Sequence, residues 1–259
     1  MRLLSSEAIL LDVVDLQERD RIVTFLTPQW GAKRGVARGA RGKYSQFAGR
    51  LQLLARVRLT WFERDDRELV RLREVSLERP ADALQRDLER LLVATYVAEH
   101  AALLAPENEP SAALFRLLDA TVGALLAGGD PDLAARYFEV WALRLSGVFP
   151  ASSACASCGR TWSDGAHLVE DELVCPDCAR GLAREQESDP SGASSTLGAA
   201  GLRLLAEIGR SSPQRIQATA EPHSGQALRE LERVNASLRR RFLGEELRSY
   251  RVMRQTLAE

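Results

Sequence analysis

The sequence predicts an α+β multidomain protein, in which a small barrel or sandwich of about five β-strands precedes a mostly α-helical domain. Three observations predict this. Apolar residues alternate with period two over the first 80 residues, the period becomes helical after Pro80, and all four cysteines lie between positions 155 and 178. We therefore expect a β-domain over residues 1–80 and a helical domain over residues 81–259, with a cysteine-containing insert at residues 151–180.

The five expected strands are short and are separated by turn signals. In the clearest of them Val57, Leu59 and Trp61 alternate with polar residues, which gives a sheet one apolar and one cationic face. The expected strands are residues 8–14, 21–27, 30–38, 51–61 and 69–77.

Helical periodicity begins after Pro80, where apolar residues recur every three to four positions. Asp130-Pro131 is a typical helix start, and Pro150 ends the helix that follows. The expected helices cover residues 84–96, 111–126, 131–148, 201–208, 228–242 and 245–257.

The cysteines form two C-x-x-C pairs, Cys155/Cys158 and Cys175/Cys178, separated by sixteen residues. Two such turns bring four thiolates around one ion, and Gly159 supplies the left-handed backbone that these turns need. We expect one structural Zn²⁺ in a ribbon or knuckle, contributing about 10 kcal/mol to the folding of the insert. Disulfides and an iron–sulfur cluster are the alternatives.

Positive charge is concentrated in the first domain. Residues 1–80 hold 16 Lys and Arg against 11 Asp and Glu, and residues 21–62 hold nine basic residues and no acidic one. Aromatic residues lie between these cations, as single-strand binding requires. The alternative is a solvated basic face over an ordinary core. The candidate DNA-binding residues are Lys33, Arg34, Arg38, Arg41, Lys43, Arg56 and Arg58.

Arg239, Arg240 and Arg241 form a possible second basic surface, although a solvated helix face explains them equally well. Among the motifs of catalysis, no Ser/His/Asp pattern, paired carboxylate signature or nucleotide-binding glycine fingerprint stands out. A binding protein is therefore favoured over an enzyme. The sequence lacks a run of roughly 18 apolar residues and a signal peptide, so we expect no membrane association and a cytoplasmic location.

Three blocks of residues follow one another along the chain. They are residues 8–10 with Arg21-Ile-Val, Thr27, Gly31 and residues 39–43; the central residues 137–150 leading into Cys155; and the carboxy-terminal residues 243–249. This ordered set resembles the RecO family of bacterial recombination mediators. No single short motif is decisive, but the resemblance spans nearly the whole chain.

The resemblance implies an amino-terminal OB-fold and a helical remainder that bears the zinc module. It also implies binding to single- and double-stranded DNA, annealing of complementary strands, and partnership with RecR and single-strand-binding protein to load RecA at the nucleoid. Several family members have lost the cysteines, so the resemblance does not make the metal essential for activity. An RNA-binding or ribosome-associated zinc-ribbon protein is the alternative, and a metalloenzyme would require an open coordination position.

Overall fold

A computed structural model describes residues 1–64, 67–185, 195–218 and 223–257. The chain divides into two compact units, residues 1–131 with 247–259 and residues 132–246. This division differs from the expected boundary at Pro80, because three helices belong to the same compact unit as the barrel. Among the described residues, none of the helices combines the length and apolar character that crossing a lipid bilayer requires.

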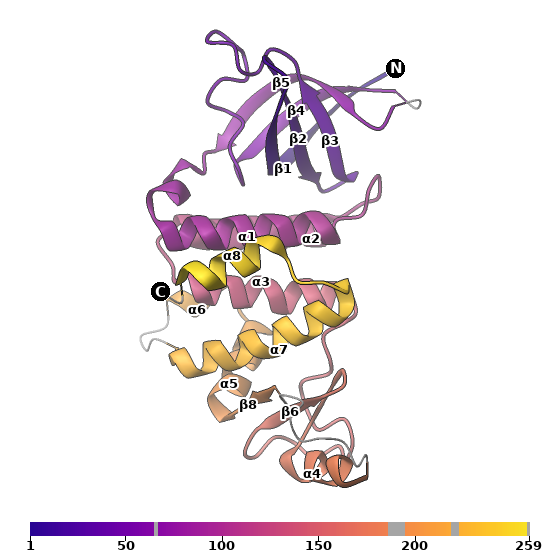
Figure 1. Cartoon of the computed structure of the whole chain (residues 1–259), viewed down its shortest axis with the longest axis vertical. Coiled ribbons are helices and arrows are strands. Elements are labelled where there is room, and N and C mark those ends of the chain that lie inside the picture. Colours follow the sequence, from indigo (N-terminus) through magenta and orange to yellow (C-terminus); the bar gives the residue numbers. More distant parts are fainter. Residues whose placement is uncertain (65–66, 186–194, 219–222, 258–259) are drawn as a thin grey trace. The chain divides into compact units, whose positions relative to one another are not determined.

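The first unit contains a closed five-stranded barrel, with the strand order β1-β2-β3-β5-β4 (Figure 1). Antiparallel pairs form all of the barrel except the β3–β5 contact, which is parallel and closes it. This is the five-stranded barrel of the OB type, as predicted. The strands are β1 (Arg2–Leu16), β2 (Asp20–Thr27), β3 (Gly31–Ala37), β4 (Arg56–Glu63) and β5 (Val70–Arg79).

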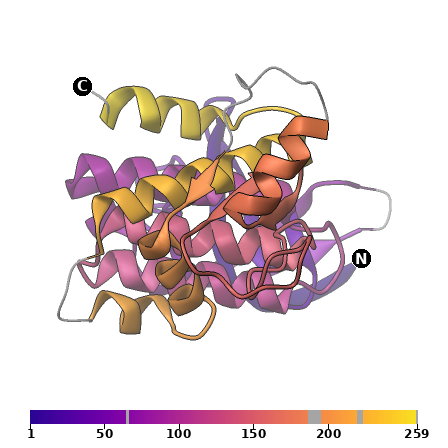
Figure 2. The same ribbon diagram turned by 90° about the horizontal axis from the view of Figure 1, so that it is seen from below.

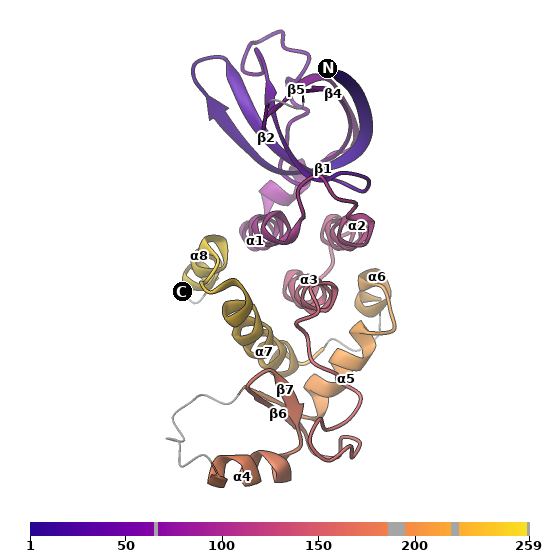
Figure 3. The same cartoon turned by 90° about the vertical axis from the view of Figure 1, so that its right-hand side faces the viewer.

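Strand β1 is longer than predicted, because its two halves pair with different neighbours. Residues 2–9 pair with β4, and residues 9–16 pair with β2, with an irregularity between Leu10 and Asp12. The first residues of β1 are mostly exposed, so no apolar alternation in the sequence marked them. Figure 3 shows the strand curving around the barrel.

The core of the barrel follows the predicted alternation. Phe25, Val57, Leu59 and Trp61 are fully buried, and the rings of Phe25 and Trp61 meet edge to face at 5.5 Å. Gly31 has a positive φ of 60°, and a Cβ there would collide with the carbonyl oxygen of Pro106. The turn before β3 therefore requires glycine.

Three helices complete the first unit. Asp87 caps the first helix by accepting a hydrogen bond from the Arg90 N–H, and the Glu99 carboxylate accepts from the Ser249 N–H at 2.8 Å to cap the last helix. The first two helices lie side by side in Figure 3, and the last carries the C-terminal end of the chain, yellow in Figure 2. They are α1 (Leu88–Leu104), preceded by the 3₁₀ helix η1 (Asp82–Arg86), α2 (Ala112–Leu126) and α8 (Arg248–Leu257).

The second unit contains helices and a small three-stranded sheet of order β7-β6-β8. The third strand of this sheet lies beyond residue 180, so the structured part of the cysteine module is larger than the predicted insert. The elements are α3 (Pro131–Leu145), β6 (Ala166–Val169), β7 (Glu172–Val174), α4 (Pro176–Glu185), β8 (Thr196–Leu197), α5 (Ala199–Ile208), α6 (Pro213–Gln217) and α7 (Gly225–Leu243).

A buried charge network joins α3 to α7 within the second unit. Glu139 is fully buried and lies 3.1 Å from Arg136 Nε and 3.2 Å from the Arg239 guanidinium. It also accepts a hydrogen bond from the Asn235 amide at 2.9 Å, and Arg239 reaches Glu246 at 2.6 Å. Buried charges are tolerated only when they are paired in this way.

Candidate nucleic-acid interface and metal centre

Strand β3 divides the predicted cations between its two faces. Lys33 pairs across the strand with the core residue Phe25, whereas Arg34 pairs with Thr24 and is exposed. Neighbouring residues of a strand point in opposite directions. The predicted DNA-binding cations therefore cannot form one continuous surface along this strand.

Lys33 is buried rather than available to a ligand. Its ammonium pairs with Glu63 and donates to Asn108 Oδ1 at 2.6 Å, and its side chain is only 6% exposed. The carboxylate lies one residue beyond the acid-free segment, and the amide is supplied by the loop between α1 and α2. This buried and paired position argues against the prediction that Lys33 contacts DNA.

Arg56 and Arg58 belong to an ion-pair network on the outer face of β4. Arg56 lies 2.7 Å from Glu7 and 2.8 Å from Asp119, and Arg58 lies 3.3 Å from Glu7 and 3.1 Å from Glu78. Burial lowers the pKa of Arg56, but Asp119, Glu7 and Glu78 outweigh this effect and raise it. These two arginines are neutralised by carboxylates that lie far away in the sequence.

The loop between β3 and β4 holds Arg41 and Lys43. The Arg41 Nε lies 3.4 Å from Asp15, and another guanidinium nitrogen donates to the Gln17 carbonyl at 3.0 Å. Surface pairs of this kind are worth about 0–1 kcal/mol, so Arg41 can exchange its partner. Lys43 is exposed, with its Nζ 5.7 Å from the centroid of the Tyr44 ring.

Four exposed arginines form what we call the cationic face of the barrel. Within the described ranges none of the four makes an ion pair. Val36 lies beside Arg71 across the parallel β3–β5 contact, so residues 35 positions apart in the sequence contribute to one surface. The cationic face consists of Arg34, Arg38, Arg67 and Arg71.

The cationic face borders two cavities of about 420 and 470 Å³ that share the segment from Arg67 to Val70. Arg34 lines the first cavity, and Arg38 and Arg71 line the second; Glu68 lines both. Residues 67–69 belong to the β4–β5 loop, and Val70 begins β5. The second cavity also reaches the turn between β1 and β2, where Leu16 and Asp20 line it. In OB-folds these two loops and the face of β2 and β3 bind oligonucleotides.

The sequence reasoning missed Arg67 and Arg71, because both lie beyond the acid-free segment. Arg71 lies between Val70 and Leu72, which are both buried, so this alternation is a signal from which an outward arginine on β5 could be predicted. No comparable signal existed for Arg67, which lies in a loop.

The predicted second basic surface is wrong for Arg239. Its side chain is fully buried and pairs with Glu139 and Glu246. Consecutive helix residues are turned by about 100°, so three adjacent arginines cannot share one face. The side chains of Arg240 and Arg241 are 65% and 51% exposed, and Arg241 pairs with Asp171.

The four cysteines converge as predicted. The Sγ atoms of Cys155, Cys158, Cys175 and Cys178 all lie within 4.8 Å of one another, and those of Cys158 and Cys175 are 3.9 Å apart. A tetrahedral Zn²⁺ with bonds of about 2.3 Å requires sulfur–sulfur distances of about 3.8 Å. The described cysteines are free thiols, not disulfides. The cluster could hold a metal ion.

Backbone geometry supports the thiolate form at part of this cluster. Gly159 adopts the predicted left-handed conformation with a φ of 70°, and the Cys175 N–H donates to Cys155 Sγ at 3.2 Å. A hydrogen bond from Arg160 lowers the pKa of Cys158 to about 6. The Ser157 hydrogen bond lowers the pKa of Cys178, but hydrogen bonding with Cys175 and Cys158 outweighs it and raises the pKa to about 11.

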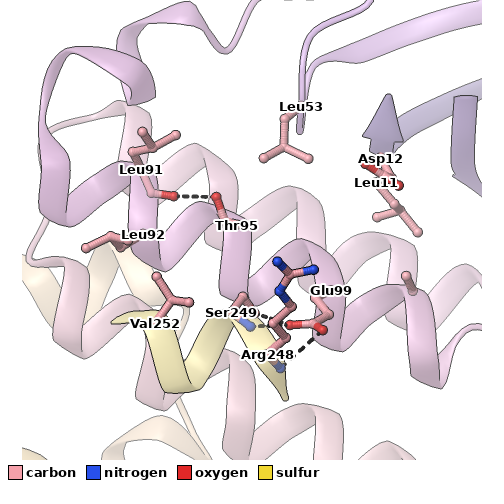
Figure 4. A pocket seen from close by; sticks show the side chains of 11 residues that line it. Leu11, Asp12, Leu53, Leu91, Leu92, Thr95, Glu99, Arg248, Ser249 and Val252 are labelled. Carbon is pink, nitrogen blue, oxygen red and sulfur yellow. Dashed lines mark hydrogen bonds between the residues drawn. The ribbon is translucent and has the colours of Figure 1, made fainter. Parts of the chain in front are cut away.

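A further cavity in the first unit has a different character. It measures about 540 Å³ and lies between β1, α1 and α8. Its lining combines apolar side chains, four leucines among them, with five polar or charged residues (Figure 4). Its polar groups are largely engaged, because Thr95 donates to the Leu91 carbonyl at 2.8 Å and Glu99 accepts from Ser249. Arg248 is the one cation among its lining residues, whereas four arginines gather on the cationic face.

Comparison with known proteins agrees with this architecture. Residues 1–81 match the family model described as Recombination protein O N terminal, and residues 85–251 match Recombination protein O C terminal. Relatives named DNA repair protein RecO include one from Anaeromyxobacter dehalogenans (strain 2CP-C), 35% identical over 85% of this chain and 91% of its own length. Another, from Koribacter versatilis (strain Ellin345), is 35% identical over 68% of this chain and 72% of its own length.

The two family models together cover almost all of the chain, and the match to the first relative extends through both compact units. The barrel and the helical remainder are the parts that the sequence resemblance implied. The chain belongs to the RecO family of DNA repair and recombination proteins.

Proposed function

We propose that the chain binds single- and double-stranded DNA by the sugar-phosphate backbone, through the cationic face of its barrel, and anneals complementary strands. In this proposal the chain acts by binding and catalyses no reaction. With RecR it helps to load RecA onto strands covered by single-strand-binding protein. Membership of the RecO family is the support for proposing these partners.

One observation carries the proposal: Arg34, Arg38, Arg67 and Arg71 are exposed, lack an ion-pair partner among the described residues, and border the part of an OB barrel that binds nucleic acid. An arginine already neutralised by a carboxylate gains little from a phosphate, whereas a free one releases condensed counterions. The free arginines are therefore the better candidates than Arg56 or Arg58.

Annealing requires no bond-making by the protein. Cations that neutralise phosphates reduce the repulsion between two approaching strands, and base pairing then supplies the free energy. Backbone contacts carry no sequence information, so the same face serves any complementary pair.

The bound metal is proposed to be one Zn²⁺ held by the four cysteine sulfurs. Support comes from the four-cysteine donor set and from the 3.9 Å distance between the Cys158 and Cys175 sulfurs, which is close to that of a tetrahedral site. Four thiolates leave no coordination position for water or substrate, so the ion would brace the module rather than act in a reaction. The small β6–β7–β8 sheet has little core of its own, which is where such a brace is needed.

A strand-annealing assay tests the DNA proposal. The variant Arg34→Gln/Arg38→Gln/Arg71→Gln should anneal complementary oligonucleotides much more slowly than the wild type, because three free cations are lost. Arg58→Gln is the matched control, since Arg58 is comparably exposed but already paired with Glu7 and Glu78. Unchanged annealing by the folded triple variant would exclude the cationic face as the DNA-binding surface.

Competition between DNA and RNA of equal length separates the proposal from an RNA-binding role. DNA should compete at least as well as RNA for the wild-type protein. Loading of RecA onto strands coated with single-strand-binding protein, measured with and without RecR, tests the partners. No stimulation by the chain in the presence of RecR would contradict the mediator role.

A further inference from the structure

The aromatic residues of the acid-free segment differ sharply in exposure. Five of the six are engaged by the fold: three are buried, the ring of Trp30 meets that of Trp61 at 5.5 Å, and the ring of Phe62 lies 5.8 Å below the Arg73 guanidinium. The three buried rings belong to Phe25, Phe47 and Trp61. Tyr44 is the exception, with 92% of its surface exposed.

Both sides of the loop that carries Tyr44 are anchored to the barrel. On one side the Gly39 N–H donates to Asp20 at 2.8 Å, and the Arg41 N–H donates to the Arg19 carbonyl at 3.0 Å. Asp20 also lines the cavity beside Arg38. This anchor therefore places the beginning of the loop next to the cationic face.

On the other side of the tip the loop is held on β5. The Gln46 amide donates to the Arg73 carbonyl at 2.6 Å, and Arg50 donates to the Val75 carbonyl at 2.9 Å. Phe47 is 2% exposed and covers the core from this side. Tyr44 is thus presented to solvent by a loop whose flanks are fixed, and its ring contributes almost nothing to the core.

We propose that Tyr44 stacks on an unpaired base and so adds to the affinity of the chain for single strands, while Lys43 neutralises a neighbouring phosphate. This inference rests on the proposed function and adds a residue that distinguishes paired from unpaired bases. The Lys43 Nζ lies 5.7 Å from the ring centroid on one side, and the opposite face of the ring is open to a ligand. Every base has a π-face, so stacking of this kind tolerates any sequence.

The duplex offers no partner to the ring, because its bases are already stacked on one another. Arginine contacts to phosphates do not discriminate between the two forms, since both carry the same backbone. A stacking tyrosine therefore favours the unpaired strand alone, and the formation of base pairs would release it. An annealing protein needs such a release, because it must dissociate from the strands once they have paired.

The test compares Tyr44→Ala, Tyr44→Phe and the wild type on three ligands. These are an oligothymidylate of about 16 nucleotides, the same backbone with abasic sites, and a duplex of equal length. Tyr44→Ala should weaken binding of the oligothymidylate by about 5- to 140-fold, the loss expected for one stacked base. Binding of the abasic strand and of the duplex should change less than about twofold, and Tyr44→Phe should restore wild-type affinity.

Phe242→Ala is the matched control, because Phe242 is an aromatic residue that is 46% exposed on α7. It should bind all three ligands like the wild type. Equal affinity of Tyr44→Ala and wild type for the oligothymidylate would overturn the inference, as would an equal loss on the abasic strand. Either result would leave the proposed function intact if the wild type still binds and the triple arginine variant does not.

Discussion

For the proposed binding of single strands, the cations of the cationic face together with Lys43 set the expected salt dependence. The four arginines of the cationic face and Lys43 are exposed and lack ion pairs with described residues. Five phosphate contacts predict a slope of log K against log salt of about −3.5 for a single strand. Affinity should therefore fall about 130-fold between roughly 50 and 200 mM salt.

Replacing three of these cations gives the decisive comparison. The variant Arg34→Gln/Arg38→Gln/Arg71→Gln keeps two contacts, so its slope should be about −1.4 and its affinity should fall only about sevenfold over the same range. Fluorescence anisotropy of a labelled oligonucleotide at several salt concentrations measures both slopes. Thermal melting verifies that the variant is folded, which we expect because the replaced side chains are exposed.

Arg58→Gln should keep the wild-type slope, because its guanidinium is already neutralised by Glu7 and Glu78. A triple variant whose slope stays near that of the wild type would refute the assignment of phosphate contact to the cationic face. A wild-type slope near zero would refute backbone binding altogether.

Further predictions concern the buried charges and the cysteines. Glu139→Ala leaves Arg136 and Arg239 buried without their shared carboxylate, so urea unfolding should show a free energy of unfolding lower by about 3–5 kcal/mol. The control Glu172→Ala removes an exposed carboxylate and should change it by less than about 0.5 kcal/mol. Lys33→Met should lower stability by about 1–3 kcal/mol through the stranded Glu63 carboxylate, and a changed salt slope in this variant would contradict a purely structural Lys33. In metal-free protein Cys158 should be alkylated before Cys178, since the pKa of Cys158 is lowered to about 6 and that of Cys178 is raised to about 11. Bound Zn²⁺ should protect Cys158 from alkylation. Mass spectrometry of the labelled peptides measures both effects. Because Cys178 must lose its proton on binding, zinc affinity should fall as the pH is lowered, and an affinity independent of pH would exclude thiolate ligation.

Local patterns predicted the elements well, because each pattern depends on contacts that every strand or helix makes. The alternation around Val57, Leu59 and Trp61 led to a buried barrel strand, and the C-x-x-C pairs led to a converged cluster. In both cases a spacing of two or three residues is enough to fix which side chains share a face or a turn.

The fate of individual cations could not be predicted in the same way. Arg56 is neutralised by Asp119, which is 63 residues further along the chain and reaches it only because α2 packs on the barrel. Lys33 meets Asn108, 75 residues away, for a similar reason. A segment without acidic residues therefore says nothing about the carboxylates that the fold brings to it.

The pairing of these cations divides the basic charge of the barrel into two parts with different consequences. Arg56, Arg58 and Lys33 pair with carboxylates from other elements. Replacing them should therefore affect the stability of the first unit more than the binding of a ligand. Arg34, Arg38 and Arg71 make no ion pair with any described residue, so their positive potential extends into solvent and attracts a polyanion. The relevant quantity for binding is thus the charge left after pairing rather than the charge in the sequence. Because that remaining charge gathers where β3, β5 and the β4–β5 loop meet, a strand bound there would run past Arg38 toward the loop that presents Tyr44.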